Sequence, residues 1–157
     1  MLKAIKTKTV RANGGRFAIV ASTFNARFVD SMLRAAKKEL ARANVAEIKI
    51  VRVPGAYEIP VVAANLARNS VKKFSAIICL GVVLRGATTH AQHIAESVSD
   101  ALMQIQIETE SPVIHEVLLL ENEQQARERC LDKKHNRGTE AAQTALEMAR
   151  VMESLGK

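Results

Sequence analysis

The sequence alternates between short apolar runs and longer amphipathic segments, and this alternation constrains the fold more than any other feature. Four short runs have the length of β-strands: the first is a continuous apolar run typical of a strand buried on both faces, whereas the second, residues 48–53, is half alternating. Each is followed by apolar residues at helical spacing, as with Met32, Leu33 and Ala36 after the first run. Strands that alternate with helices run parallel and are joined by right-handed crossovers. We therefore predict an α/β fold with strands at 16–22, 48–53, 76–84 and 113–120.

Local signals indicate where the helices begin. Asn25 is suited to cap the helix after the first strand, and Pro60 suits the first turn of a short helix that ends near Arg68. The sequence breaks again at residues 137–138, before a long final amphipathic stretch. The predicted helices begin near Asn25, Pro60, His90, Glu123 and Arg137.

The length of 157 residues suits one domain and is too short for two. Aromatic residues make up only 3% of the chain, so the core must consist of aliphatic residues and Met. About 12 residues at the N-terminus fit none of the strand–helix units, and are either a disordered tail or a segment that docks on a neighbouring chain. We predict a single domain at 13–157, preceded by a docking segment at 1–12.

Cysteine usage and hydrophobicity indicate the cellular compartment of the protein. Cys79 and Cys130 lack the spacing of a zinc site or a disulfide framework, which fits a reducing compartment. No apolar run approaches the roughly 20 residues of a membrane helix, and the N-terminus lacks the apolar stretch of a secretory signal. We expect a cytoplasmic protein that does not bind membranes.

The net charge of +7 is compatible with a nucleic acid, an anionic surface or an anionic small molecule as partner. The basic residues are dispersed, apart from two groups within residues 3–11 and 133–137. Proteins that bind single-stranded nucleic acid usually stack its bases on aromatic side chains, and no aromatic residues are interleaved with these basic groups. A solvated basic face is the simpler interpretation, and we predict no nucleic-acid partner.

The predicted topology brings distant residues together. Every strand-to-helix turn of a parallel sheet opens at the same edge, and ligands bind there, beyond the carboxyl ends of the strands. We call this edge the strand-end site; its four turns are residues 23–27, 53–58, 82–90 and 120–123.

Within the third turn, residues 85–90 have the features of an anion site. Gly86 and Ala87 let a ligand approach the backbone, while the free N–H groups and dipole of the following helix favour negative charge. The hydroxyl of Thr88 adds a donor and Arg85 adds charge. A plain helix start is the alternative, and neither common nucleotide-binding loop pattern is present. This turn predicts a small phosphorylated substrate.

His90 follows this turn and is the candidate general acid or base, because the unperturbed pKa of histidine, about 6.5, lies near working pH. His93 lies one helical turn further on. The other two histidines, His115 and His135, lack metal-ligand spacing to this pair, so we predict no metal. Taken alone, His90 would be interpreted as an ordinary surface histidine; its place beside the anion turn favours catalysis.

Two further residues suit a ligand at the same edge. Phe24 offers a flat face for stacking, and Glu58 is a candidate acceptor for substrate hydroxyls. The alternatives are a core phenylalanine and a solvated helix-start carboxylate. Arg129 belongs to an ordinary exposed charge pattern, and nothing local indicates that it reaches the site.

Four stretches, taken together, resemble the lumazine synthase family, which catalyses the penultimate step of riboflavin biosynthesis. They are Phe24-Asn25, residues 53–60 (VPGAYEIP), residues 80–90 (LGVVLRGATTH) and residues 136–138 with the final helix. The resemblance implies a three-layer α/β/α sandwich around a four-stranded parallel, flavodoxin-like sheet. It also implies a cofactor-independent transferase that condenses 5-amino-6-(D-ribitylamino)-2,4(1H,3H)-pyrimidinedione with 3,4-dihydroxy-2-butanone 4-phosphate to give 6,7-dimethyl-8-ribityllumazine.

The resemblance further implies a role for each matching residue. His90 would be catalytic and move protons, Phe24 would stack on the pyrimidine ring, and Glu58 would accept hydrogen bonds from ribityl hydroxyls. Phosphate binding is implied for Ala87, Thr88 and Arg129. The other implied pyrimidine and ribityl contacts are Asn25, Ala56, Tyr57, Val82, Val83, Leu84, His115 and Arg137.

The chain departs from the family pattern at several positions. His115 stands where the family often has an aromatic residue that faces the site of an adjacent subunit, and Arg137 stands where lysine is usual. Residues 130–135 lack the glycines typical of members that build sixty-subunit shells. We expect pentamers, or decamers of paired pentamers, with sites at subunit interfaces. The alternative function is a lumazine- or flavin-binding protein of the same fold with weak turnover.

Overall fold

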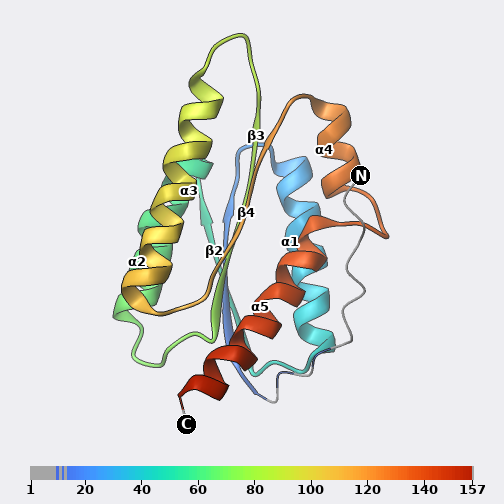
Figure 1. The fold of residues 1–157 in the computed structure, drawn as a ribbon. Helices are drawn as coiled ribbons and strands as arrows, with labels where there is room; N and C mark the ends of the chain where they lie inside the picture. The colour runs from blue at the N-terminus through green and yellow to red at the C-terminus, as the bar shows by residue number, and fades with distance from the viewer. Residues whose placement is uncertain (1–9, 11, 13, 157) are drawn as a thin grey trace.

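The computed structural model describes residues 10, 12 and 14–156. The N-terminal docking segment predicted at 1–12 therefore lies almost entirely outside the described residues. In chain order the elements are β1 (Arg16–Ser22), α1 (Ala26–Arg42), β2 (Glu47–Val53), the short 3-10 helix η1 (Ala56–Glu58), α2 (Ile59–Asn69), β3 (Ala76–Leu84), α3 (His90–Thr109), β4 (Val113–Leu120), α4 (Glu123–Cys130) and α5 (Arg137–Leu155) (Figure 1). The predicted strands and helices are confirmed, and η1 is an additional turn that the sequence analysis did not predict.

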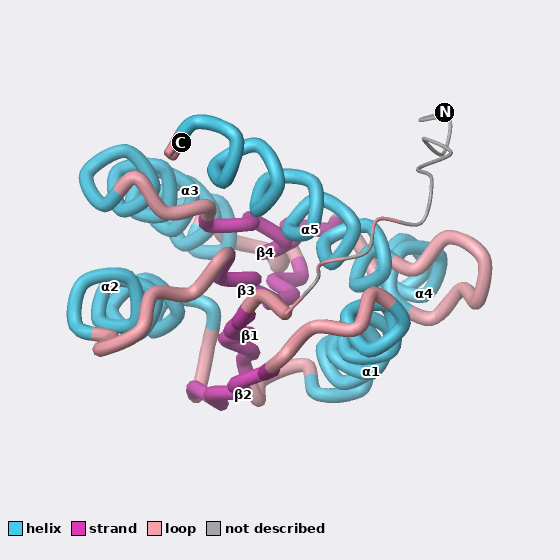
Figure 2. Tube along the Cα trace, turned by 90° about the horizontal axis from the view of Figure 1, so that it is seen from below, coloured by secondary structure: helices cyan, strands magenta, loops and turns pink. Residues whose placement is uncertain are grey.

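The strands form one fully parallel sheet in the order β2-β1-β3-β4. Helices α2 and α3 cover one face, and α1, α4 and α5 cover the other (Figure 2). This arrangement confirms the expected three-layer, flavodoxin-like sandwich. The chain runs outward from β1 to β2 and then returns to the opposite side of β1, so the strand order reverses between β1 and β3, where ligands bind in folds of this kind.

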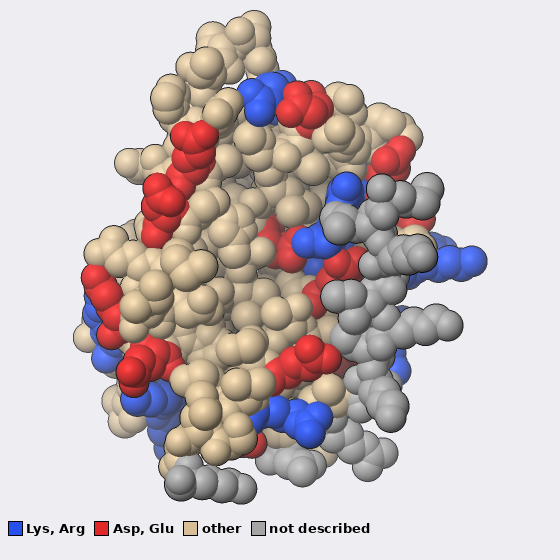
Figure 3. All heavy atoms as spheres, viewed as in Figure 1, with Lys and Arg blue, Asp and Glu red and all other residues tan. Residues whose placement is uncertain are grey.

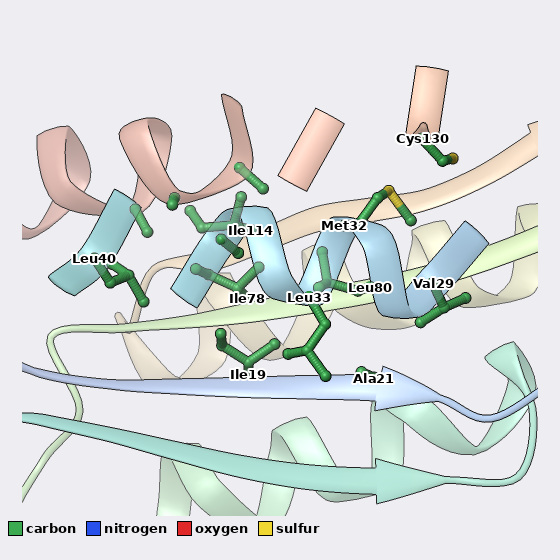
Figure 4. Packing of buried hydrophobic residues seen from close by; sticks show 14 of the residues in the cluster. Ile19, Ala21, Val29, Met32, Leu33, Leu40, Ile78, Leu80, Ile114 and Cys130 are labelled. Carbon is green, nitrogen blue, oxygen red and sulfur yellow. The ribbon is translucent and has the colours of Figure 1, made fainter. Parts of the chain in front are cut away.

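The two central strands are buried on both faces, which explains why their sequences read as continuous apolar runs rather than alternating ones. On one face Ile19, Ile78 and Leu80 pack under α1 and α5 (Figure 4). On the other, Val20 and Cys79 pack against α2 and α3. The two layers are mainly aliphatic, but Phe17, Phe28 and Phe74 are buried in them as well, so the expectation of a core without aromatic residues is wrong.

The contact between α1 and α5 depends on the absence of a side chain at Gly138. A Cβ atom at this position would collide with the backbone of Met32, in the middle of α1. Asn136 caps α5 by accepting a hydrogen bond from the N–H of Gly138 at 2.9 Å. The sequence break at residues 137–138 therefore lies inside the first turn of α5, and the helix begins there because of the Asn136 cap.

Among the residues that the structure describes, no helix is both long and apolar enough to cross a lipid bilayer.

Candidate active site

The first two turns of the strand-end site are joined by backbone hydrogen bonds. Thr23 donates its N–H to the carbonyl of Val53 at 2.8 Å, and Phe24 donates its N–H to that of Pro54 at 2.9 Å. The hydroxyl of Thr23 also donates to Pro54, at 3.1 Å. The β1–α1 turn and the segment that leads into η1 are therefore one connected unit, as the parallel topology predicts.

Asn25 connects this unit to β3. It occupies the N-cap position of α1 with φ 55°, in the left-handed region that asparagine tolerates better than most residues. Its side chain does not cap the helix, contrary to the prediction. Instead, Nδ2 donates to the carbonyl of Val82 at 2.8 Å, across the point where the strand order reverses. The amide thereby spans the position at which a ligand is expected.

Two aromatic side chains on these turns are open to solvent. Phe24 is 72% exposed and Tyr57 is 64% exposed, whereas Phe17, Phe28 and Phe74 are buried. Exposed aromatic rings are not core residues, so the alternative interpretation of Phe24 as a core residue is wrong. Both rings present apolar faces that a planar ligand could cover.

Glu58 has a structural contact as well as an exposed carboxylate. Its Oε2 accepts a hydrogen bond from the N–H of Gly55 at 2.8 Å, which closes the η1 turn. Within the described chain its second carboxylate oxygen has no hydrogen-bond partner, so that oxygen is available to a ligand hydroxyl. Ala56, the first residue of η1, is buried.

The third turn joins the fourth through Arg85. Its N–H donates to the carbonyl of Leu120 at 2.8 Å, and its Nε forms an ion pair with Glu121 at 2.9 Å. The guanidinium also donates to Gln92 at 3.3 Å. Because the charge of Arg85 is paired with Glu121, the structure gives this residue a smaller share in anion binding than the sequence suggested.

The start of α3 remains open for an anion. Thr89 is the N-cap residue, but its side chain makes no capping hydrogen bond. The only side-chain contact to the first-turn N–H groups within the described chain is a long one of 3.4 Å, from the N–H of His90 to the hydroxyl of Thr88. Ala87, Thr88 and His90 are all exposed. Open backbone donors at a helix N-terminus favour a phosphate group, with His90 beside it.

Both cysteines are buried and unpaired. Burial raises the pKa of both Cys79 and Cys130 to about 12, so neither is a thiolate at neutral pH. In the part of the chain that the structure describes, no group of three or more His, Cys, Asp or Glu side chains is placed to hold a metal ion.

Val82, Val83 and Leu84 end β3 at the strand-end site, whereas His115 and Arg137 lie around β4. His115 and Glu116 are consecutive on this strand and therefore face opposite sides of the sheet. His115 contacts Ser99 on α3, with 2.7 Å between Nε2 and Oγ, whereas Glu116 faces α5 and pairs with Arg137. Viewed toward β4, the surface carries charged side chains on both flanks of an uncharged central band (Figure 3).

Arg137 is held by two carboxylates of its own chain. Its Nε lies 2.6 Å from Oε1 of Glu116, and its Nη1 lies 2.6 Å from Oε2 of Glu140. Glu116 is only 4% exposed; burial raises the pKa of its carboxyl, and the charge of Arg137 opposes this shift. Arg129, exposed on α4, lies near enough to lower the pKa of Glu116 as well, and has no ion-pair partner among the described residues. Of the two arginines, Arg129 is the one available to an anion.

Comparison with known proteins identifies the family. The profile of the 6,7-dimethyl-8-ribityllumazine synthase family matches residues 14–153. The chain belongs to the lumazine synthase family. A 6,7-dimethyl-8-ribityllumazine synthase from Desulfotalea psychrophila is 41% identical over 148 residues, which are 93% of this chain and 94% of that protein. Lumazine synthases from Stenotrophomonas maltophilia (42% identity; 89% of this chain, 90% of that protein) and Xanthomonas euvesicatoria (40% identity; 93% and 95%) are similar over nearly the same length.

Two of the predicted site residues of this lumazine synthase family member, His115 and Arg137, have side-chain partners that the sequence analysis did not identify. Ser99 supports His115, and Glu116 and Glu140 hold Arg137. Only Glu116 gave a detectable signal in the sequence, as a charged residue inside an apolar strand, since such residues are rarely buried unless paired.

Proposed function

We propose that this chain catalyses the condensation of 5-amino-6-(D-ribitylamino)-2,4(1H,3H)-pyrimidinedione with 3,4-dihydroxy-2-butanone 4-phosphate. The products are 6,7-dimethyl-8-ribityllumazine, phosphate and two molecules of water. The observation that carries this proposal is the family match over residues 14–153, which includes the turn from Arg85 to His90 at the strand-end site. This reaction is the penultimate step of riboflavin biosynthesis.

The exposed groups at the strand-end site suit both substrates. The open first turn of α3, with Ala87 and Thr88, would bind the phosphate of the butanone. Phe24 would stack on the pyrimidine ring, and the free oxygen of Glu58 would accept hydrogen bonds from the ribityl chain. Backbone groups of residues 82–84 would hold the ring edge, beside Asn25, Ala56 and Tyr57.

The chemistry requires positioning and proton transfer. The amine attacks the ketone and water leaves as the imine forms; phosphate is then eliminated, and ring closure releases the second water. His90 would give and take the protons of these steps beside the bound phosphate. Because amine and ketone are reactive partners and phosphate is a good leaving group, holding the two substrates together accounts for much of the rate.

We also propose that each site is completed by an adjacent subunit. His115 and Arg137 lie around β4, away from the strand-end site of their own chain, which supports a contribution to a neighbour's site. Arg129 is the third phosphate ligand in this proposal. The assembly would be a cytoplasmic pentamer or decamer, with residues 1–12 docked on the neighbouring subunit. In this proposal Arg137 acts first within its own chain, because two carboxylates hold its guanidinium.

The test is to identify the products. Incubation with both substrates should give one lumazine, recognised by mass and fluorescence, for each phosphate released. Binding of a lumazine or riboflavin without formation of either product would contradict the proposal and favour the ligand-binding alternative.

A further inference from the structure

The imidazole of His115 is fixed by three consecutive hydrogen bonds. The N–H of Val117 donates to Nδ1 of His115 at 3.3 Å, and Nε2 of the ring lies 2.7 Å from Oγ of Ser99. The hydroxyl of Ser99 in turn lies 2.7 Å from the carbonyl of Ala95, one turn earlier on α3. Both ring nitrogens therefore have a partner within the chain.

These partners permit one arrangement of protons. A backbone N–H can only donate, so Nδ1 must carry a lone pair and the ring proton of a neutral imidazole must lie on Nε2. Nε2–H then donates to Oγ of Ser99, and the single hydroxyl proton of Ser99 goes to the carbonyl of Ala95. The opposite tautomer would point Nδ1–H at the N–H of Val117, donor against donor.

The surroundings also oppose protonation of the ring. Burial lowers the pKa of His115, and a backbone hydrogen bond of the same residue opposes part of this shift. Among the described residues, no ion pair or hydrogen bond to an acidic side chain stabilises the cation. A second proton on Nδ1 would break the contact with Val117. The ring nitrogens are thus occupied, while the side chain remains exposed at the edge of the sheet.

We propose that Ser99 is a positioning residue that fixes the orientation of the neutral Nε2–H imidazole of His115, so that its ring serves as a flat, uncharged stacking face for the pyrimidine substrate. With both nitrogens engaged, His115 neither moves protons nor donates hydrogen bonds to the substrate, which leaves proton transfer to His90. The substrate part of this inference rests on the proposed function; the tautomer does not.

The direct test is magic-angle-spinning NMR of sedimented protein labelled with [15N]histidine, a method that accepts an assembly of any size. The chain has four histidines, and a His115→Phe spectrum identifies the signals of His115 by subtraction. We expect one protonated nitrogen at Nε2 and an unprotonated Nδ1. Ser99→Ala should keep the Nε2–H tautomer, because the N–H of Val117 still faces Nδ1, but should shift the Nε2 signal as its hydrogen bond is lost. Ser99→Thr, which keeps the hydroxyl, should retain the original signal. A protonated Nδ1 in the unmodified protein, or a Ser99→Ala spectrum unchanged from it, would overturn the inference.

Kinetics test the positioning role. Ser99→Ala should raise the KM for the pyrimidinedione about fivefold, roughly the effect of losing one neutral hydrogen bond, with little change in kcat. Ser99→Thr should restore KM. In a His115→Phe background Ser99→Ala should have no further effect, because phenylalanine makes no hydrogen bond with Ser99. An unchanged KM in Ser99→Ala alone would overturn the positioning role even where the tautomer is as expected.

Ser70→Ala is the matched control. Ser70 donates its hydroxyl to the carbonyl four residues earlier, Leu66, at 2.7 Å, as Ser99 does, but it has no histidine partner. This variant should leave KM and the histidine spectrum unchanged. If the chain gives no product at all, the proposed function fails while the NMR measurement still decides the tautomer.

Discussion

At the scale of single residues, His90 and His115 differ in what their imidazoles are free to do. His90 is exposed at the start of α3, beside open backbone donors, whereas both nitrogens of His115 are occupied. Both histidines were candidate site residues in the sequence, but this difference between them could not be predicted. The partners of His115 are Ser99 on α3 and the backbone of Val117 on β4. No spacing rule connects residue 99 to residue 115.

His90→Ala should lower kcat roughly 100-fold without abolishing turnover, because positioned proton transfer contributes about that much while substrate positioning persists. The measurement is kcat under saturating substrates. His93→Ala, a change of the same kind one helical turn further on, serves as the control and should leave kcat near its original value. Undiminished turnover in His90→Ala would remove His90 from the mechanism.

Arg137 should prove to be structural first. Arg137→Met would leave Glu116, only 4% exposed, without its partner, and should lower the free energy of unfolding by about 3 kcal/mol, the range for breaking a buried ion pair. Urea denaturation measures this loss. The double variant Glu116→Gln with Arg137→Met should recover most of the stability, since no unpaired charge remains. A stable Arg137→Met with only a raised KM would instead support a substrate-binding role.

At the scale of secondary-structure elements, the apolar runs were sufficient to predict the strands, because β1 and β3 are buried on both faces. η1 was missed because a three-residue turn has no period to detect. Gly138 suggested a break between elements, yet it lies within α5. Glycine is needed at this position because α1 approaches so closely that no side chain fits. Contacts of this kind are set by packing and not by local sequence.

Gly138→Ala should destabilise the protein by about 1–3 kcal/mol, the usual cost of overpacking. Alanine stabilises a helix relative to glycine by only roughly 0.5–1 kcal/mol, which is less than this cost. The collision with Met32 therefore makes the net change in stability unfavourable. Chemical denaturation measures the change. Gly86→Ala is the control, because a Cβ there meets nothing within 4 Å and stability should change little. Equal stability of the two variants would contradict the described α1–α5 contact.

At the scale of the whole molecule, the parallel topology joins the four turns, and this could be predicted from the order of elements alone. The hydrogen bonds from Thr23 and Phe24 to the second turn, and the ion pair from Arg85 to the fourth, bear it out. The contribution proposed for His115, Arg129 and Arg137 could not be predicted from the order of elements, since these residues lie around β4 and the order of elements carries no information about neighbouring subunits.

The assembly should contain five or ten chains. We expect this size from the resemblance to the family and from the absence of glycine in residues 130–135. Light scattering coupled to size-exclusion chromatography measures the mass. A mass near sixty chains would contradict the expectation drawn from residues 130–135, and an active monomer would contradict the shared site.

The central claim, that this chain is a lumazine synthase acting at the strand-end site, is tested most directly by a rate. Purified protein is mixed with both substrates, and the initial rate of lumazine formation is divided by the uncatalysed rate in the same buffer. The account predicts a rate well above background that rises in proportion to the protein. A rate equal to background, with a lumazine still bound, would contradict it.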